Sequence, residues 1–324
     1  MMKFRAIAAI ALAVLCLASC KKDEEKEYMD GSLLISGILP TYVAPGGTYT
    51  FSASGVTVPD GTKVGYYFKN PFTSVLDTTD VYSFTVQDEP GSYNLTCVAF
   101  PAESSDKYYS TSTYRTFTVV TESSLQGIPE YAGGGTVSIG SRSYPTFQAC
   151  GLEWLGSNLS LVPDGSSGHP YAGCPAMLEP LGAFYTWEEA SDICPSGWRL
   201  PTDSEWVELI KLAGGPEGLQ PHADSPAGAG NLMVKCTFNG SNLWEYYRGV
   251  NILNATHFSA IPAGYATISS GSDSFTGFGS YAAFWTADEQ DGMGVYRYIY
   301  QEYDNVYAGL GDKDSFGASV RCVR

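Results

Sequence analysis

Hydrophobic and polar residues alternate with a period of two along much of the first third of the chain. Residues 48–53, 92–99 and 116–119 each show this pattern, which is typical of β-strands with one buried face. Turn-forming residues separate such segments, as at 44–47 and 89–91. About five to seven short strands fit into this stretch, so residues 31–121 are predicted to form an all-β sandwich.

One stretch farther along has a helical period instead. Trp187, Ala190 and Cys194 recur at i, i+3 and i+7, which places them on one face of a helix. Pro195 follows directly, and its ring and missing N–H end a helix. The pattern therefore predicts a short helix that begins near Trp187.

A second helix is expected directly after Thr202. Thr202 and Glu205 have the spacing of a capping box, in which the hydroxyl accepts the N3 amide and the carboxylate reaches back. The helical hydrophobic positions that follow are Trp206, Leu209, Ile210 and Ala213. With a Gly-rich linker at 122–135, residues 136–324 are predicted to form an α+β domain with two short helices.

Composition narrows the classes of partner. The chain has 324 residues, with 34 acidic side chains against 18 Lys and Arg, and a net charge of −16. Such acidity disfavours a phosphate backbone, so we expect no nucleic-acid partner. Only 16% of residues are charged and 14% are aromatic, including 23 Tyr, which argues against a disordered chain. The length fits two domains.

Residues 1–20 have the form of a secretory signal. Lys3 and Arg5 precede an apolar run at 6–18 that is too short to cross a bilayer. The run ends in the tetrad LASC, which resembles the lipobox of bacterial lipoproteins. In that class the Cys becomes the first residue and carries a diacylglycerol. The resemblance implies that an acylated Cys20 anchors the chain in outer-membrane lipid.

Residues 21–30 are expected to form a charged tether. The run KKDEEKE begins directly after Cys20. It resembles the export signal of lipoproteins displayed on the outside of the outer membrane, although a solvated tether explains the same residues. We therefore expect an outer-membrane lipoprotein that faces the cell exterior.

The first domain resembles a known surface module. The segments APGGTYTFSASG, VGYYF and DEPGSYNLTCVAF follow one another in the order of a PKD-type, immunoglobulin-like domain. The resemblance implies a spacer. Cys97 shares a strand face with Tyr93 and Leu95 and has no partner cysteine in residues 31–121, so we expect a buried free thiol.

The second domain carries a more specific resemblance. The segment CPSGWRLPTDSEWVEL at 194–209 resembles the signature of the Fibrobacter succinogenes major paralogous (FISUMP) domain. The blocks YPTFQACGLEWLGSNLSL, HFSAIPAGY, YAAFWTADE and FGASVRCVR follow the same family plan in order, over residues 136–324. That family in turn resembles the C-type-lectin-like fold and its relatives, the formylglycine-generating enzymes.

This resemblance implies a disulfide. In the lectin-like fold a cysteine at the end of the first helix bonds a cysteine in the last strand, and these positions match Cys194 and Cys322. An oxidising compartment permits the bond. Cys150 and Cys174 form a second candidate pair, which leaves Cys236 over together with Cys97.

No catalytic residue is predicted. The chain has no Gly-x-Ser-x-Gly, His-Glu-x-x-His, P-loop or Gly-x-Gly-x-x-Gly motif, and its cysteines and histidines lack zinc spacing. It also has no cysteine pair that matches the formylglycine-generating enzymes. We therefore expect a protein that is not an enzyme and holds no cofactor, with a polysaccharide-processing enzyme as the third alternative.

Binding is the favoured function. The Glu-Pro-Asn and Gln-Pro-Asp triplets of calcium-dependent sugar binders are missing, although oxygen-rich acidic loops could still hold calcium. The candidate ligand-contacting residues are Trp244, Tyr246, Tyr247, Asp288, Glu289, Asp291 and Asp304. Tyrosines at 296–300 could add a stacking platform, but their alternation also fits a strand with one buried face.

The sequence therefore predicts an adhesin-like surface lipoprotein whose C-terminal domain binds an extracellular glycan or protein. The alternative is a structural, accessory or tip subunit of a surface or pilus assembly.

Overall fold

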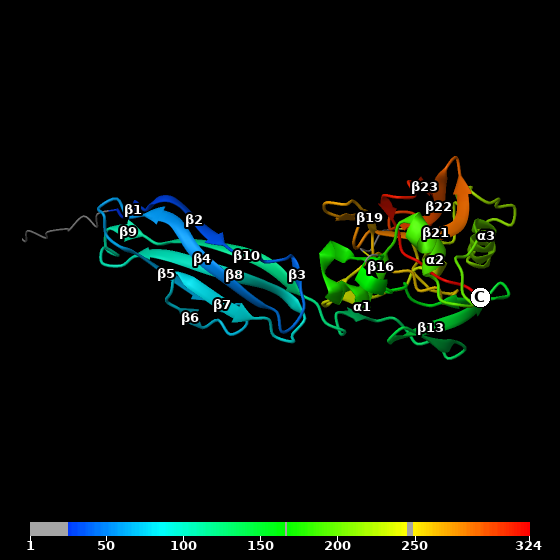
Figure 1. The fold of residues 1–324 in the computed structure, drawn as a ribbon, viewed down its shortest axis with the longest axis horizontal. Helices are drawn as coiled ribbons and strands as arrows, with labels where there is room; N and C mark the ends of the chain where they lie inside the picture. The colour runs from blue at the N-terminus through cyan, green and yellow to red at the C-terminus, as the bar shows by residue number, and fades with distance from the viewer. Residues whose placement is uncertain (1–24, 166, 245–248) are drawn as a thin grey trace, which may run out of the picture.

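The computed structural model describes residues 25–165, 167–244 and 249–324 (Figure 1). Strands predominate and the helices are few and short, as the sequence predicts. Two β-rich domains lie end to end along the long axis of the molecule. The signal segment with Cys20 and the candidates Tyr246 and Tyr247 fall outside the described residues. None of the described helices has the length and apolar character needed to cross a membrane.

The first domain consists mainly of two sheets. Its three-stranded sheet contains β2 (Asp30–Ser36), β4 (Thr48–Thr57) and β7 (Val81–Thr85). Its five-stranded sheet contains β3 (Tyr42–Val43), β10 (Thr111–Val119), β8 (Gly91–Pro101), β5 (Val64–Lys69) and β6 (Leu76–Asp77), in that order. The three segments with period-two alternation are thus confirmed as strands, in β4, β8 and β10.

Aromatic side chains from both sheets form the core of this domain. Phe51 and Phe84 of the smaller sheet pack with Phe68 and Phe117 of the larger one, and all four are at most 4% exposed. The Phe84 and Phe117 rings stack at 5.5 Å. Cys97 is a free thiol in the same core, as predicted, and burial raises its pKa to about 11. Residues of alternating strands therefore meet between two sheets, as the hydrophobic pattern requires.

The end of the predicted tether already belongs to this domain. β1 (Glu27–Tyr28) pairs in parallel with β9 (Tyr108–Tyr109), and Lys26 donates a hydrogen bond to the Ser105 carbonyl at 2.7 Å. The charged run is therefore attached to the sandwich at its C-terminal end, within the described residues.

The second domain combines several small sheets with short helices. Its strands are β12 (Gly135–Ile139), β13 (Arg142–Ala149), β14 (Leu152–Leu155), β15 (His169–Pro170), β16 (Ala183–Phe184), β17 (Thr237–Phe238), β18 (Ser241–Asn242), β19 (Tyr265–Thr267), β20 (Ser274–Thr276), β21 (Tyr281–Gln290), β22 (Met293–Tyr300), β23 (Val306–Gly311) and β24 (Phe316–Gly317). Its helices are α1 (Leu178–Leu181), α2 (Trp187–Ile193), α3 (Asp203–Leu212) and α4 (Ala229–Leu232), with 3-10 turns η1 (Pro163–Gly165), η2 (Tyr171–Gly173) and η3 (Pro175–Met177).

The two predicted helices are confirmed. The Thr202 hydroxyl accepts the Glu205 amide while the Glu205 carboxylate accepts the Thr202 amide, so the capping box is present at the start of α3. A second box, Thr186 with Glu189, begins α2. Helices α1 and α4, of four residues each, were not predicted, because one helical turn is too short to show a periodic pattern.

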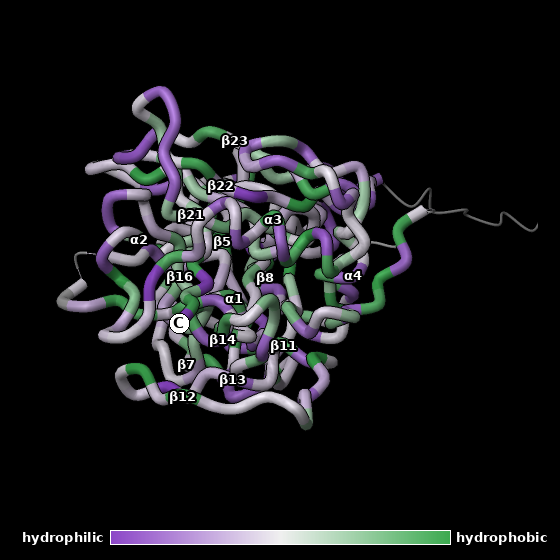
Figure 2. The backbone as a smooth tube through the Cα atoms, turned by 90° about the vertical axis from the view of Figure 1, so that its right-hand side faces the viewer, coloured by the Kyte–Doolittle hydropathy of each residue, from purple (hydrophilic) through white to green (hydrophobic). Residues whose placement is uncertain are grey.

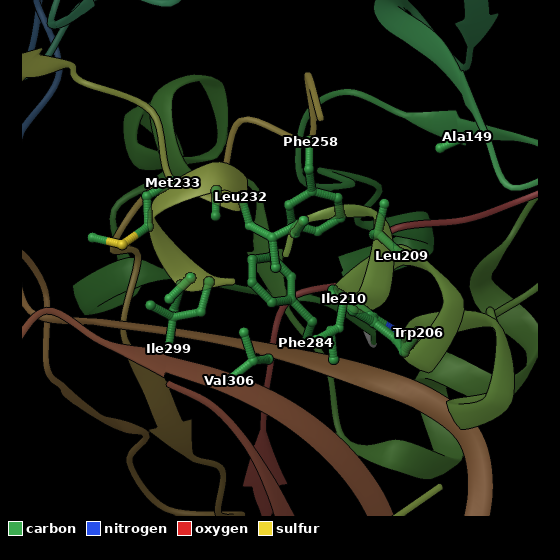
Figure 3. Packing of buried hydrophobic residues seen from close by; sticks show 14 of the residues in the cluster. Ala149, Trp206, Leu209, Ile210, Leu232, Met233, Phe258, Phe284, Ile299 and Val306 are labelled. Atoms are coloured by element: carbon green, nitrogen blue, oxygen red, sulfur yellow. The ribbon is translucent and has the colours of Figure 1, made fainter. Parts of the chain in front are cut away.

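Helix α3 packs on the sheet β21–β22–β23 (Figure 3). The Trp206 ring lies 5.1 Å from Phe258 and 5.5 Å from Phe284 of β21, and all three are at most 1% exposed. Ile299 of β22 and Val306 of β23 complete this layer. This core covers one face of the sheet. On the other face, Tyr296 and Tyr298 pack against a second buried cluster that includes Trp285.

The cysteines give one confirmation and one correction. Cys194 and Cys322 are bonded, with 5.9 Å between their Cα atoms, as the family resemblance implies. The second predicted pair is wrong: Cys150 and Cys174 are both free thiols. Cys150 is exposed in the β13–β14 turn with a φ of 52°, whereas Cys174 is buried in a different part of the domain. The remaining thiol, Cys236, is free and buried.

The connection between the domains is partly ordered as a strand. β11 (Leu125–Gln126), inside the predicted linker, pairs with β17. The Asn239 side-chain amide donates to the Val119 carbonyl at 3.0 Å, and its backbone amide donates to the Ser124 carbonyl. The ring of Tyr42 meets that of Tyr171 edge-on at 5.7 Å. Backbone pairing and packing therefore join the sandwich to the second domain.

Candidate functional site

The structure places the predicted ligand contacts apart from one another. Trp244 is only 5% exposed, and its indole N–H donates to the Ala260 carbonyl at 3.2 Å. A side chain held in this way presents no stacking face, so the prediction for Trp244 is wrong. Its aromatic and polar parts are both satisfied inside the domain.

The predicted acidic residues mainly support the backbone. Asp288 accepts the Asp203 amide and faces a His222 ring nitrogen at 3.2 Å. Asp304 accepts the Gly230 amide at 2.7 Å, at the beginning of α4. These contacts use carboxylate oxygens that a ligand would otherwise need.

Glu289 and Asp291 lie near the tip of the β21–β22 hairpin. Glu289 pairs with Lys313, and Asp291 has a φ of 53° in the turn. Within the described ranges, no group of three or more His, Cys, Asp or Glu side chains is arranged to hold a metal ion. The acidic residues therefore do not converge into one site.

A continuous aromatic surface lies on the sheet β21–β22–β23 instead. In β22, Val295, Arg297 and Ile299 point into the core and are at most 1% exposed, whereas Tyr296, Tyr298 and neighbouring Tyr300 are half-buried. Neighbouring strands and loops add further rings. We call this group the tyrosine cluster; its members are Tyr265, Tyr281, Tyr296, Tyr298, Tyr300, Tyr303, Tyr307 and Phe316.

The rings of the tyrosine cluster touch in a chain across the sheet. Tyr281 and Tyr300, opposite each other in β21 and β22, stack at 4.5 Å with 17° between their planes. Tyr298 stacks on Tyr307 of β23 at 4.8 Å. Tyr296 stacks on Phe316 at 4.5 Å. Cross-strand aromatic pairs of this kind stabilise a sheet, and these tyrosines stay partly accessible at its surface.

Small residues make room for these rings. A Cβ added at Gly309 of β23 would lie 2.4 Å from the Tyr296 ring. A Cβ at Gly311 would lie 2.6 Å from Phe316, and one at Gly294 would lie 2.3 Å from Trp187. Such distances are far inside van der Waals contact, so the glycines are required where the rings cross the neighbouring strand.

Four hydroxyls of the tyrosine cluster, those of Tyr281, Tyr296, Tyr298 and Tyr307, have raised pKa values and stay neutral. Burial raises the pKa of Tyr296 to about 12, with a smaller contribution from Tyr298. Burial also raises the pKa values of Tyr281, Tyr298 and Tyr307, and Asp224 adds to the shift in the last two. A neutral phenol both donates and accepts a hydrogen bond. The cluster therefore offers ring faces together with hydroxyls that can do both.

Sequence reasoning found part of this surface. The alternation at 296–300 predicts the strand, and β22 confirms it. The alternation does not show which face of β22 is buried, because Arg297 occupies a core position where a charged side chain is unexpected. Tyr265 and Tyr307 come from other segments, and only the fold brings them against Phe316 and Tyr298 of the cluster.

The second domain can be assigned to a family. The family profile described as Fibrobacter succinogenes major domain matches residues 149–324. The chain belongs to this family. The FISUMP region contains both bonded cysteines, α2, α3 and the whole tyrosine cluster, while β12 and nearly all of β13 precede the matched residues. A search of curated proteins finds no match to the chain.

Proposed function

We propose that the protein is a lipoprotein of the outer cell surface whose FISUMP domain binds an extracellular ligand through the tyrosine cluster. The favoured ligand is a glycan, with a protein as the other class. The half-buried, mutually stacked tyrosines carry this proposal. Rigid Tyr side chains supply large contact areas at a low cost in conformational entropy, and their hydroxyls add hydrogen bonds.

The chemistry of a glycan suits such a surface. The apolar face of a sugar ring can lie on a tyrosine ring, while its hydroxyls pair with groups that donate and accept. Tyr298 and Tyr307 already present stacked, neutral rings next to each other. Because neighbouring strands already fix these rings, binding a ligand costs little side-chain conformational entropy.

The other parts of the chain fit the same proposal. Cys20, acylated, would anchor the protein in outer-membrane lipid, and the charged run after it would direct the protein outward. The first domain would act as a PKD-type, immunoglobulin-like spacer that holds the FISUMP domain away from the membrane. For the FISUMP domain we keep the C-type-lectin-like fold as our interpretation, with no cofactor and no enzymatic activity.

One observation favours the alternative of a subunit in a surface or pilus assembly. Val75, Leu76 and Val81 are 64%, 58% and 55% exposed on the first domain. They lie at β6 and β7, which are edge strands of their sheets. An apolar, open sheet edge is suited to pairing with a strand of another chain.

A glycan array probed with residues 21–324 separates these functions. The proposal expects binding to a defined subset of glycans. Binding to no glycan, together with specific co-purification of other surface proteins, would favour the assembly subunit, and hydrolysis of arrayed glycans would favour the enzyme. Protease treatment of whole cells tests localisation, since a chain that survives intact does not face the exterior.

A further inference from the structure

A cavity lies on the far side of the FISUMP domain from the tyrosine cluster. β13 and β14 lie opposite β22 and β23 in both views (Figure 1, Figure 2). Beside β13 and β14 is a cavity of about 470 Å³, lined among others by Ser143, Ser157, Asn158, Ser259 and Arg321. This volume is typical of a site for a small molecule.

Arg321 stands out among these residues because it is a buried cation. It is 1% exposed. Its Nε donates to the Asn158 Oδ1 at 2.8 Å, and its Nη1 donates to the carbonyls of Leu155 and Phe258. Its Nη2 donates to the Ser259 carbonyl at 3.1 Å. Four neutral oxygens therefore accept hydrogen bonds from the guanidinium, and its central carbon lies 4.6 Å from the Phe258 ring and 5.7 Å from the Phe284 ring.

No carboxylate among the described residues forms an ion pair with Arg321. The contrast with Arg297 is informative, because Arg297 is equally buried but is held by Asp203 through two bonds of 2.6 Å. Burial lowers the pKa of Arg321 to about 9, so the side chain still carries its charge at neutral pH. A buried charge without a counter-ion is unfavourable, and an incoming anion would relieve it.

The other charged groups of the cavity do not cancel this charge. Arg142 and Glu179 pair with each other at 3.1 Å near the opening. Glu122 is exposed and lies among the lining residues. Glu122 is thus exposed whereas Arg321 is buried, so the charge that lies deep in the cavity is positive. Serine hydroxyls and apolar side chains such as Leu181 and Ile261 line the remaining space.

We propose that this cavity binds an acidic monosaccharide, with Arg321 as the counter-ion of its carboxylate and the Ser143 and Ser157 hydroxyls as partners of its ring hydroxyls. The site is separate from the tyrosine cluster, so the two proposals stand or fall independently.

Titration calorimetry with glucuronate, glucose and acetate tests this site in a chain of residues 21–324. Because Arg321 variants can fail to fold, the informative variant is Ser143→Phe, which fills the cavity from an exposed strand position. Ser112→Phe, at an exposed strand position of the first domain, is the matched control. Glucuronate should bind at least about tenfold more tightly than glucose or acetate.

We expect Ser143→Phe to weaken glucuronate binding at least about tenfold and Ser112→Phe to leave it unchanged. Substitution of the tyrosine cluster should also leave it unchanged, which distinguishes this site from the proposed function. Glucose or acetate binding as tightly as glucuronate, no binding of glucuronate, or equal binding by Ser143→Phe would each overturn the proposal.

Discussion

Arg297 of β22 and Asp203 of α3 form a fully buried, two-pronged ion pair behind the tyrosine cluster. Nε and Nη2 of Arg297 lie 2.6 Å from the two Asp203 oxygens, and both side chains are 0% exposed. Asp203 also accepts the His222 amide at 2.6 Å. The pair therefore fixes the strand that carries Tyr296 and Tyr298 to the first turn of α3.

Asp203→Asn should strongly destabilise the FISUMP domain. The substitution leaves Arg297 buried without its counter-charge, which typically costs about 3–5 kcal/mol. The free energy of unfolding in urea, followed by tryptophan fluorescence, measures the loss. The double variant Asp203→Leu/Arg297→Met removes both charges and should lose less than Asp203→Asn. A loss below about 1 kcal/mol in Asp203→Asn would contradict the role of this pair.

The Cys194–Cys322 bond should contribute a large part of the stability. It joins residues 128 positions apart, and chain-entropy arguments assign about 4–5 kcal/mol to loops of that length. Cys194→Ser/Cys322→Ser should therefore lower the denaturation midpoint to that of the reduced wild type. Cys150→Ser, at an exposed free thiol, is the control and should have no such effect. Mass spectrometry without reduction should find Cys322 bonded, and a free Cys322 would contradict the structure.

Stability should depend on pH through His169. Its Nε2 faces Glu189 at 3.3 Å and its Nδ1 faces Asp273 at 2.7 Å, and the hydrogen bond to Glu189 is the main cause of its raised pKa. Burial alone would raise the pKa of Glu189, but bonds to His169 and to the Thr186 amide outweigh burial and lower it. When it is protonated, His169 therefore links β15 to α2 and to the loop before β20.

A raised histidine pKa stabilises the folded state at low pH. This contribution is complete below the unfolded value of about 6.5, and it is lost as pH rises through the folded pKa. The difference in melting temperature between wild type and His169→Gln should therefore be largest near about pH 6 and shrink above that. A difference that stays constant, or grows, with rising pH would show that His169 acts only through packing.

Gly309→Ala should disturb the packing of the tyrosine cluster. The added methyl would lie 2.4 Å from the Tyr296 ring, so the ring or β23 must move. We expect a loss of about 1–3 kcal/mol, together with a change in the near-ultraviolet circular dichroism of the tyrosines. Gly271→Ala, where nothing lies within 4 Å, is the control. Equal spectra for the two variants would mean that the close approach at Gly309 is unimportant.

Local signals in the sequence predicted the local structure well. The Thr202–Glu205 spacing specifies a capping box regardless of the rest of the fold, and it is present. The same Thr-x-x-Glu spacing at Thr186–Glu189 likewise forms a capping box. The Cys194–Cys322 bond followed from the family resemblance, since a sequence separation of 128 leaves no local signal.

The candidate site was harder to predict because it depends on contacts between distant segments. Trp244 looks like a stacking platform in sequence, but its indole finds an acceptor in Ala260 and is buried. A charged residue such as Arg297 predicts that its face of β22 is exposed. Only the ion pair with the distant Asp203 makes burial of that face favourable. The tyrosines that remain half-buried are therefore the ones on the opposite face.

The glycan-binding claim is tested most directly on two stacked residues, Tyr298 and Tyr307, whose ring centroids lie 4.8 Å apart. A chain of residues 21–324 and its Tyr298→Ala/Tyr307→Ala variant should be compared on one glycan array. Tyr114→Ala is the control, at a tyrosine that is 66% exposed on the first domain.

We predict that the wild-type chain and Tyr114→Ala bind the same defined glycans and that the double variant, folded by circular dichroism, loses at least about 90% of the signal. Equal binding by the double variant, or no glycan bound by the wild-type chain, would contradict the claim that the tyrosine cluster binds glycans.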